Sequence, residues 1–398
     1  MPPPDLHLST LHRLKTVDMH VSSSPVRIVY SGMPSSFSTI STVSSPRHHF
    51  THHHDSLRHL LLSSPRAPPS LHAALILPCP TARRTSIIRL LFLSPSPPFY
   101  PAFSTPSILA LARFLVDFPS LIDVYALSHP EFTALPDPEG YPHLISGEKM
   151  LQLATPAGTL DVTVPVTGLG KSDPSRETSF VSPPAWASEV LEIPVPRNCP
   201  LTEEWMRLQR LAVPGKGEER RVVEGRLANG GGGPWYFVVL AMGSPVAEED
   251  EGGDRQVVAM KGKEEVRGVA VITDILPKEA RLEGKEREDG MLVLTVTEQG
   301  REVCPPVAAC VAALYAENAA GGKSWVYYSP ESVKLSKRGG VSGELEGPCT
   351  MEGRTGKGAV RVRVEGFATY TGLGEVIMEK DDCADDWTNL FKCMGAGE

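Results

Sequence analysis

The sequence has no Cys-x-x-Cys pair and no cluster of cysteine and histidine with the spacing of a zinc site. An odd number of scattered cysteines, without a secretory signal, fits a reducing compartment. We therefore expect a cytoplasmic protein, with a transit peptide in the acid-poor N-terminal part as the alternative. The seven cysteines are Cys79, Cys199, Cys304, Cys310, Cys349, Cys383 and Cys393.

The sequence also lacks the long uncharged apolar run, about 18 residues or more, that a membrane-spanning helix needs. The nearest candidate is the stretch 107–127. It is interrupted by two charged residues and a proline before its end, at Arg113, Asp117 and Pro119, and again at Asp123. We therefore expect no membrane span.

Acidic residues are scarce in residues 1–116, which contain three Asp or Glu and ten Lys or Arg. The whole chain, however, has a net charge of −8. This overall balance gives no reason to expect a nucleic-acid partner. The same region holds a histidine run at 48–54. Because no acidic or cysteine ligand accompanies the run, a solvated loop is favoured over a metal site. We expect no metal.

Apolar alternation between turn residues predicts many short strands. One hairpin is expected over Met150–Val164, with its turn at Pro156-Ala157-Gly158. The other expected strands are Lys15–Val21, Val26–Tyr30, Leu71–Leu77, Ser86–Leu93, Glu189–Val195, Trp235–Leu240, Val269–Thr273, Met291–Val296, Trp325–Tyr328, Val360–Val364 and Gly366–Met378. A helix end is expected over Leu57–Leu62 and a short helix over Thr202–Leu211.

Two stretches with a proline-containing turn and an apolar helix stand out among these strands: Ser104–Asp117, and Val303–Ala316, which begins with a strand end. Ser104 or Thr105 is the expected N-cap of the first, and Pro106 stands in its first turn, where proline is tolerated. A helix N-terminus that opens onto a cleft can bind an anion. The alternative is an ordinary capped helix of the core.

These elements predict an α/β (α+β) fold of two similar halves, each with strands around a central helix whose N-terminus points at a shared cleft. A chain of 398 residues is also too long for one ordinary core. We expect a loose terminus at 1–13. The first half spans 14–170 and is completed by 355–398. The second half spans 175–350 and carries an exposed insertion at about 243–266.

The motifs resemble those of the proline racemase family, which includes hydroxyproline epimerases and trans-3-hydroxy-L-proline dehydratases. The resemblance implies a diaminopimelate-epimerase-like fold, a homodimer and no cofactor. Its segments follow the family order over most of the chain. They are Thr16–His20, Pro25–Ile28, Ser31–Pro34, Asp55–Arg58, Leu60–Leu62, Pro65-Arg66, Tyr100–Asp117, Thr155–Gly158, Ser179-Phe180 with Pro183, Gly232–Tyr236, Val303–Leu314 and Thr371-Gly372 leading into Asp381-Asp382.

The resemblance implies two bases on opposite faces of the substrate α-carbon, each at the N-terminus of a central helix. The family's Cys-Gly-His triplet falls on Ser104, Thr105 and Pro106. The first base position is thus Ser104, and Thr105 and Pro106 are positions that would contact the substrate. A lone serine is un-ionised near pH 7 and needs a partner base.

The second family site, Asp-Arg-Ser-Pro-Cys/Thr-Gly-Ser/Thr-Gly, falls on residues 302–309. Its base position is Pro306, which has neither a titratable group nor an N–H. Cys304 lies two residues earlier, and a buried structural cysteine is favoured there over a displaced base. The substrate-binding positions implied at this site are Glu302, Val307 and Ala308.

Three hypotheses remain open. The chain is a dehydratase that takes the α-proton of trans-3-hydroxy-L-proline with one base, or a catalytically inactive family member that binds a ligand or is vestigial. The third is a damaged gene product over residues 35–106, where serine, proline and histidine are in excess. In the first two, the small-molecule partner is an imino acid, proline or a hydroxyproline.

Overall fold

The structure, a computed structural model, describes 16 strands and two helices. The described residues are 12–21, 24–33, 55–62, 67, 71–77, 88–95, 100–119, 147–168, 170–190, 221–227, 235–239, 269–273, 290–296, 324–328, 341–349 and 359–378.

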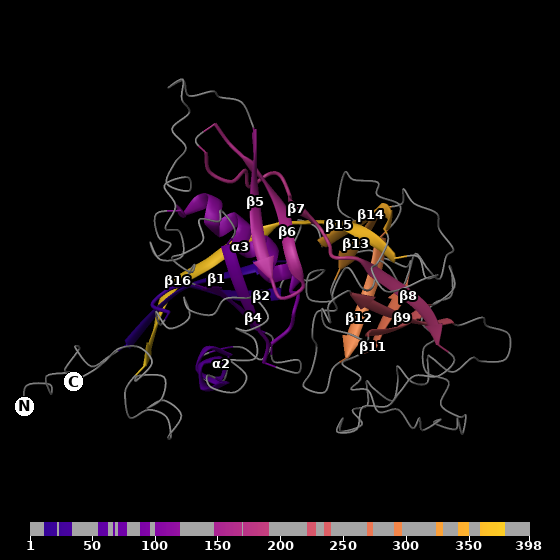
Figure 1. Ribbon diagram of the computed structural model, residues 1–398, viewed down its shortest axis with the longest axis horizontal. Helices are drawn as coiled ribbons and strands as arrows, with labels where there is room; N and C mark the ends of the chain where they lie inside the picture. Colours follow the sequence, from indigo (N-terminus) through magenta and orange to yellow (C-terminus); the bar gives the residue numbers. More distant parts are fainter. Residues whose placement is uncertain are drawn as a thin grey trace, which may run out of the picture.

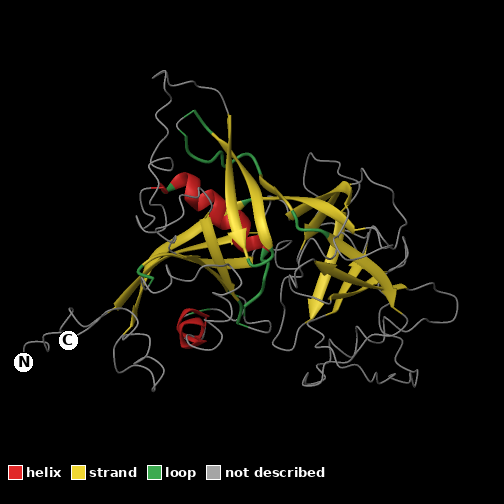
Figure 2. Cartoon of the chain, in the orientation of Figure 1, coloured by secondary structure: helices red, strands yellow, loops and turns green. Residues whose placement is uncertain are grey.

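The described helices are α2 (Asp55–Leu62) and α3 (Thr105–Asp117). The strands make up most of the described chain (Figure 2). They are β1 (His12–Val21), β2 (Ser24–Ser31), β3 (His72–Leu77), β4 (Ile88–Leu93), β5 (Gly147–Thr155), β6 (Gly158–Val166), β7 (Thr178–Val181), β8 (Ala185–Val190), β9 (Arg221–Leu227), β10 (Trp235–Val239), β11 (Val269–Thr273), β12 (Gly290–Val296), β13 (Ser324–Tyr328), β14 (Val341–Cys349), β15 (Ala359–Gly366) and β16 (Ala368–Met378).

The strands form one 16-stranded sheet in the order β14-β13-β12-β11-β10-β9-β8-β15-β7-β6-β5-β4-β3-β2-β1-β16. An additional pairing of β14 with β15 closes the strands from β8 to β15 into a ring. The other strands form a first strand group, in the sheet order β7-β6-β5-β4-β3-β2-β1-β16, which curves around α3 (Figure 1). β15 and β16 follow each other with one residue between them, so they join the ring to this first strand group.

The strands β2 and β3 are covered on both faces. Ala74 and Ile76 of β3 pack into the cluster around α3, while Ala73 and Leu75 pack into a second cluster with α2. Because β3 is covered on both faces, it is apolar from Ala73 to Leu77 instead of alternating. Figure 1 shows α2 and α3 on opposite sides of these strands.

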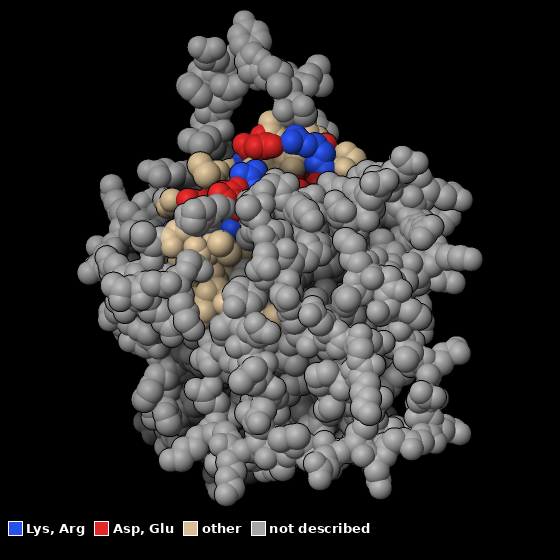
Figure 3. Space-filling view, turned by 90° about the vertical axis from the view of Figure 1, so that its right-hand side faces the viewer, with Lys and Arg blue, Asp and Glu red and all other residues tan. Residues whose placement is uncertain are grey.

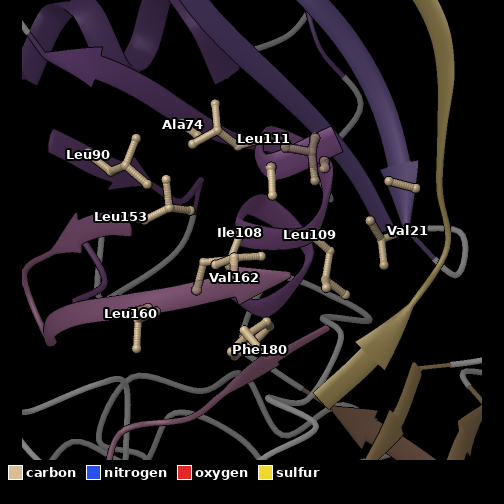
Figure 4. Packing of buried hydrophobic residues seen from close by; sticks show 14 of the residues in the cluster. Val21, Ala74, Leu90, Ile108, Leu109, Leu111, Leu153, Leu160, Val162 and Phe180 are labelled. Carbon is tan, nitrogen blue, oxygen red and sulfur yellow. The ribbon is translucent and has the colours of Figure 1, made fainter. Parts of the chain in front are cut away.

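The core of the first strand group is built around α3. Ile108, Leu109 and Leu111 are fully buried and face side chains from several strands (Figure 4). Gly366, where β15 ends, allows this close approach, because a Cβ there would lie 3.0 Å from Leu109 Cδ1. An almost wholly buried helix of this kind belongs to a core.

The structure confirms the predicted fold class, α/β with strands dominating, and the main sequence-based elements of its first part. The helix expected at Ser104–Asp117 is α3, and the expected hairpin is β5–β6, with Gly158 at φ +124° in its turn. Three strands were not predicted: β7, β9 and β14. The helix expected within Val303–Ala316 and the helix expected at Thr202–Leu211 lie outside the described residues, and the proposed boundaries of the halves stay predictions.

Candidate functional site

The candidate site is the N-terminus of α3. Ser104 has the extended backbone of an N-cap, with φ −145° and ψ 104°, and its carbonyl accepts the first helical hydrogen bond from Ile108 N at 3.0 Å. Pro106 stands in the first turn, as the sequence predicts, and has no N–H. The first amides of a helix have no partner inside it, so the amides of Thr105 and Ser107 form the donor end of α3.

The side chain of Ser104 does not cap the helix. Its Oγ donates instead to Oγ of Ser107 at 2.8 Å, and both residues are buried. Within the described chain, no carboxylate, imidazole or thiol contacts the Ser104 hydroxyl. The position that the resemblance assigns to the first base therefore holds a hydroxyl bonded to a second neutral hydroxyl. Ser107 was not singled out from the sequence, because the capping-box pattern has Glu or Gln at this position, three residues after the N-cap.

The next residue, Thr105, holds a polar atom without a partner. Thr105 is 2% exposed, and its Oγ1 has no hydrogen-bond partner in the described part of the chain. A buried hydroxyl without a hydrogen bond costs about 1–3 kcal/mol. This hydroxyl and the first amides of the helix lie within the same turn of α3.

Two segments distant in sequence from α3 meet its N-terminus. Ala157, in the β5–β6 turn, donates its N–H to the carbonyl of Ala102 at 3.1 Å. The ring of Phe180 in β7 lies 5.8 Å from that of Phe103, in an edge-to-face arrangement. The segments Tyr100–Asp117, Thr155–Gly158 and Ser179-Phe180, which carry part of the family resemblance, thus lie together in space.

The C-terminus of α3 is held by a dense polar network. The Asp117 carboxylate is buried and accepts hydrogen bonds from Ser172 N at 2.7 Å, Ser172 Oγ at 2.8 Å and Tyr370 OH at 2.8 Å. Arg113 lies 3.4 Å from the same carboxylate and also donates to the carbonyl of Ala368. Lys171 donates to the carbonyl of Asp117. The network ties α3 to β16 and to the β6–β7 connection.

Burial and the hydrogen bond to Asp117 raise the pKa of Tyr370 well above its usual value. The tyrosine ring is itself packed between Phe118, at 5.5 Å, and the Arg113 guanidinium, at 5.3 Å. Tyr370 therefore stays a neutral donor to Asp117 over the physiological range of pH.

A second polar cluster fixes the segment that leads into α3. Tyr100 OH and the Arg58 guanidinium both donate to the Asp55 carboxylate, each at 2.8 Å. The hydrogen bond from Arg58 lowers the pKa of Asp55, while burial raises the pKa of Tyr100. The cluster anchors α2 to the start of the Tyr100–Asp117 segment, four residues before Ser104.

The residues predicted at the second base site, Glu302, Cys304, Pro306, Val307 and Ala308, lie outside the described residues. The residues that are described hold no group of three or more His, Cys, Asp or Glu side chains able to bind a metal ion. No described helix is long and apolar enough to cross a membrane.

Charges of both signs lie next to each other on the described surface. Glu148 and Arg176 form an ion pair at 2.8 Å, and Lys149 donates to the carbonyl of Gly170. Figure 3 shows Lys and Arg side chains beside Asp and Glu side chains on one face of the molecule. The coloured part of this face thus carries no patch of a single sign.

The part of the chain around α3 is also the part that matches a known protein family. Residues 16–124, which include α3 and its N-terminus, match the family model described as proline racemase. Over this segment the chain is similar to the proline racemase family. No curated protein matches it by sequence. The family match reaches Ser104, Thr105 and Pro106 but ends before the second base site.

Two crystal structures have a fold similar to that of this chain over nearly its whole length. A hydroxyproline epimerase from Agrobacterium vitis, with bound trans-4-hydroxy-L-proline, has a TM-score of 0.56 and 16% identity; the alignment covers 94% of this chain and 96% of that one. A probable proline racemase from Agrobacterium radiobacter K84, with bound carbonate, has a TM-score of 0.56 and 15% identity, with 96% and 98% covered. At these identities the likeness concerns the fold alone.

Proposed function

We propose that this protein binds a small imino acid, proline or a hydroxyproline, at the N-terminus of α3, and that it does not exchange the α-proton of its ligand. The amides of the first turn and the Thr105 hydroxyl are donors suited to the ligand carboxylate. The family match covers this turn, and the epimerase of the same fold was crystallised with trans-4-hydroxy-L-proline.

The hydrogen bond from Ser104 to Ser107 carries the second part of the proposal. A racemase needs a group that is partly ionised near neutral pH, whereas a serine hydroxyl becomes a base only with help from a partner base. The contact of Ser104, at 2.8 Å, is with another serine, which cannot take its proton. The sequence adds Pro306, which has no ionisable group, at the second base position.

The competing function is dehydration of trans-3-hydroxy-L-proline, in which one base removes the α-proton and the 3-hydroxyl leaves as water. Because this reaction uses one face of the site, Pro306 affects it less than it would affect a racemase. Ser104 would then be the base. We also propose that the protein forms a homodimer and is located in the cytoplasm.

The test combines binding with proton exchange on the purified chain. Calorimetric titrations with L-proline, trans-4-hydroxy-L-proline and trans-3-hydroxy-L-proline measure affinity, and proton NMR in deuterium oxide follows the α-proton of each compound. We expect binding of at least one compound with no exchange and no pyrroline product. Exchange of the α-proton of proline or 4-hydroxyproline contradicts the proposal.

Two variants separate the inactive protein from the dehydratase. If the wild type turns trans-3-hydroxy-L-proline over and Ser104→Ala does not, Ser104 is the base and the dehydratase is the function. The matched control is Ser175→Ala, which removes an exposed serine in the β6–β7 connection, far in sequence from α3. If neither substitution changes the affinity of a binding wild type, the ligand is held by the helix amides rather than by the Ser104 hydroxyl.

A further inference from the structure

The segment 100–104 leads into α3 without regular secondary structure. It passes from one face of the sheet to the other: Tyr100 packs into the cluster that contains α2, whereas Ala102 and Phe103 pack into the cluster around α3. Figure 1 shows α2 and α3 on opposite sides of the strands between them. Because no ladder of main-chain hydrogen bonds fixes such a segment, its individual contacts determine where it places Ser104.

The segment is held on both sides of the sheet. On the α3 side it contacts the β5–β6 turn and β7. On the α2 side, Tyr100 is 4% exposed and its hydroxyl donates to Oδ1 of Asp55 at 2.8 Å. Asp55 stays ionised, because hydrogen bonds from Arg58 to both of its oxygens lower its pKa. A hydrogen bond to a carboxylate is stronger than one between neutral groups, so this contact fixes the start of the segment.

The helix α2 is a firm support for Tyr100, because its other end is held as well. Arg27 of β2 donates to the carbonyl of Leu61, in the last turn of α2, at 2.9 Å. The same guanidinium donates to both oxygens of Asp18 in β1, each at 2.8 Å. Since α3 packs on the opposite face of β1 and β2, Tyr100 is held in a fixed relation to the strands that also carry α3.

We propose, on the basis of the ligand-binding function proposed above, that Tyr100 is a positioning residue of the site. Its hydrogen bond to Asp55 sets the place of Ser104 and of the first amides of α3, and thereby the affinity for the ligand carboxylate. Tyr100 acts through the segment and not by touching the ligand, because its ring packs with α2 on the other face of the sheet. Donors displaced by about 1 Å lose much of their effect on a ligand.

The opposite end of α3 offers a matched comparison. Tyr370 OH also donates to a carboxylate at 2.8 Å, that of Asp117, and burial raises the pKa of both tyrosines. The 13 residues of α3 separate this contact from Ser104 by about 20 Å along the helix axis. If both hydroxyls only stabilised the fold, removal of either one would cost stability and leave the ligand site unchanged.

The experiment compares Tyr100→Phe with Tyr370→Phe by calorimetric titration with L-proline and trans-4-hydroxy-L-proline, at a temperature at which circular dichroism shows both variants folded. We expect Tyr100→Phe to raise the dissociation constant about fivefold or more, and Tyr370→Phe to keep it within about twofold of the wild type. If the wild type binds and both variants bind equally well, the positioning role is overturned while the proposed function stands.

A thiol at position 104 gives a second readout that needs no ligand. A helix N-terminus lowers the pKa of a thiol below its free value of about 8.5, so the Ser104→Cys thiol reports where the helix amides lie. In this background we expect Tyr100→Phe to move the thiol pKa toward the free value and Tyr370→Phe to leave it unchanged. This response in a protein that binds no imino acid would overturn the proposed function and support the role of Tyr100. A thiol that responds to both substitutions alike, or to neither, overturns that role.

The two carboxylates allow the same comparison from the acceptor side. Asp55→Asn and Asp117→Asn replace each carboxylate with a neutral amide, which accepts a weaker hydrogen bond. We expect Asp55→Asn alone to weaken binding and to raise the thiol pKa at position 104. These variants decide the question if a tyrosine variant does not fold. Effects that are equal in the two variants, or larger in Asp117→Asn, overturn the proposal.

Discussion

The two ends of α3 are built in opposite ways. At the C-terminus, the buried charge of Asp117 is matched by donors from three segments of the chain. At the N-terminus no charged side chain takes part among the described residues: two serines bond each other, and the Thr105 hydroxyl bonds no described residue. A buried polar group that stays unsatisfied weakens the fold. The difference suggests that the C-terminal end serves stability, whereas the N-terminal end keeps donors available for a ligand.

The largest effect on stability is expected from a substitution in the hydrogen-bonded network at the C-terminus of α3. Asp117→Ala leaves the donors of Ser172, Tyr370 and Arg113 without their shared acceptor, and we expect it to lower the free energy of unfolding by about 3 kcal/mol. Urea denaturation of wild type and variant measures this. The control is Asp161→Ala, which removes an exposed carboxylate that accepts from Gln152 at 3.1 Å and should cost less than about 0.5 kcal/mol. Equal losses in the two variants would show that the network around Asp117 contributes no more to stability than an exposed hydrogen bond.

A smaller loss is expected from one member of the network. Tyr370→Phe keeps the ring against Phe118 and removes the hydroxyl that donates to Asp117, so it should cost about 1.5 kcal/mol near pH 7. Because the folded pKa of Tyr370 lies above its unfolded value near 10, its contribution is complete below about pH 10 and is lost as the pH rises further.

Thermal unfolding at pH 7 and above pH 10 tests this pH dependence. We expect the stability difference between wild type and Tyr370→Phe to shrink at the alkaline pH. A difference that stays constant would mean that the hydroxyl contributes nothing through its protonation.

The two ends of α3 also differ in how far the sequence predicts them. The helix, its N-cap and Pro106 follow from local signals, namely an apolar pattern after a turn rich in serine and proline. The network around Asp117 does not, because Ser172 and Tyr370 are 55 and 253 residues away and only the sheet order brings them together. The bond between Ser104 and Ser107 is local but was missed, since a serine at an N-cap is expected to bond the backbone.

The strands show the same division. The alternating hairpin β5–β6 is readable from its turn residues, whereas β7 has four residues and is defined by its neighbours β6 and β15. The exposure of two apolar side chains on β16 could not be read from the sequence either. Leu373 and Ile377 look like ordinary buried positions until the pairing shows that β16 lies at the end of the sheet of described strands.

At the N-terminal end, a substitution should act with the opposite sign. Thr105→Val keeps the shape of the side chain and replaces the unsatisfied hydroxyl with a methyl group, so we expect the free energy of unfolding to rise by about 1 kcal/mol. The same change should weaken binding of the imino acid, if the hydroxyl donates to its carboxylate. Denaturation and calorimetry measure the two effects, and a variant that is less stable than the wild type would show that the hydroxyl is satisfied in the folded protein.

The smallest effect on stability, and the most direct test of the proposed site, comes from Ser104→Cys. A thiol is close to a hydroxyl in size, so the free energy of unfolding should change by less than about 1 kcal/mol. Two influences act on its pKa: burial raises it, and the N-terminus of α3 lowers it. We expect the effect of the helix N-terminus to be the larger one and the pKa to fall below the free value of about 8.5.

Alkylation rates at position 104, followed by mass spectrometry across pH, give this value. Ser175→Cys, in the exposed connection, is the reference and should titrate near the free value. A pKa at position 104 equal to or above that of the reference would mean that this end of α3 does not stabilise negative charge. It would contradict the proposal that the N-terminus of α3 binds the carboxylate of a ligand.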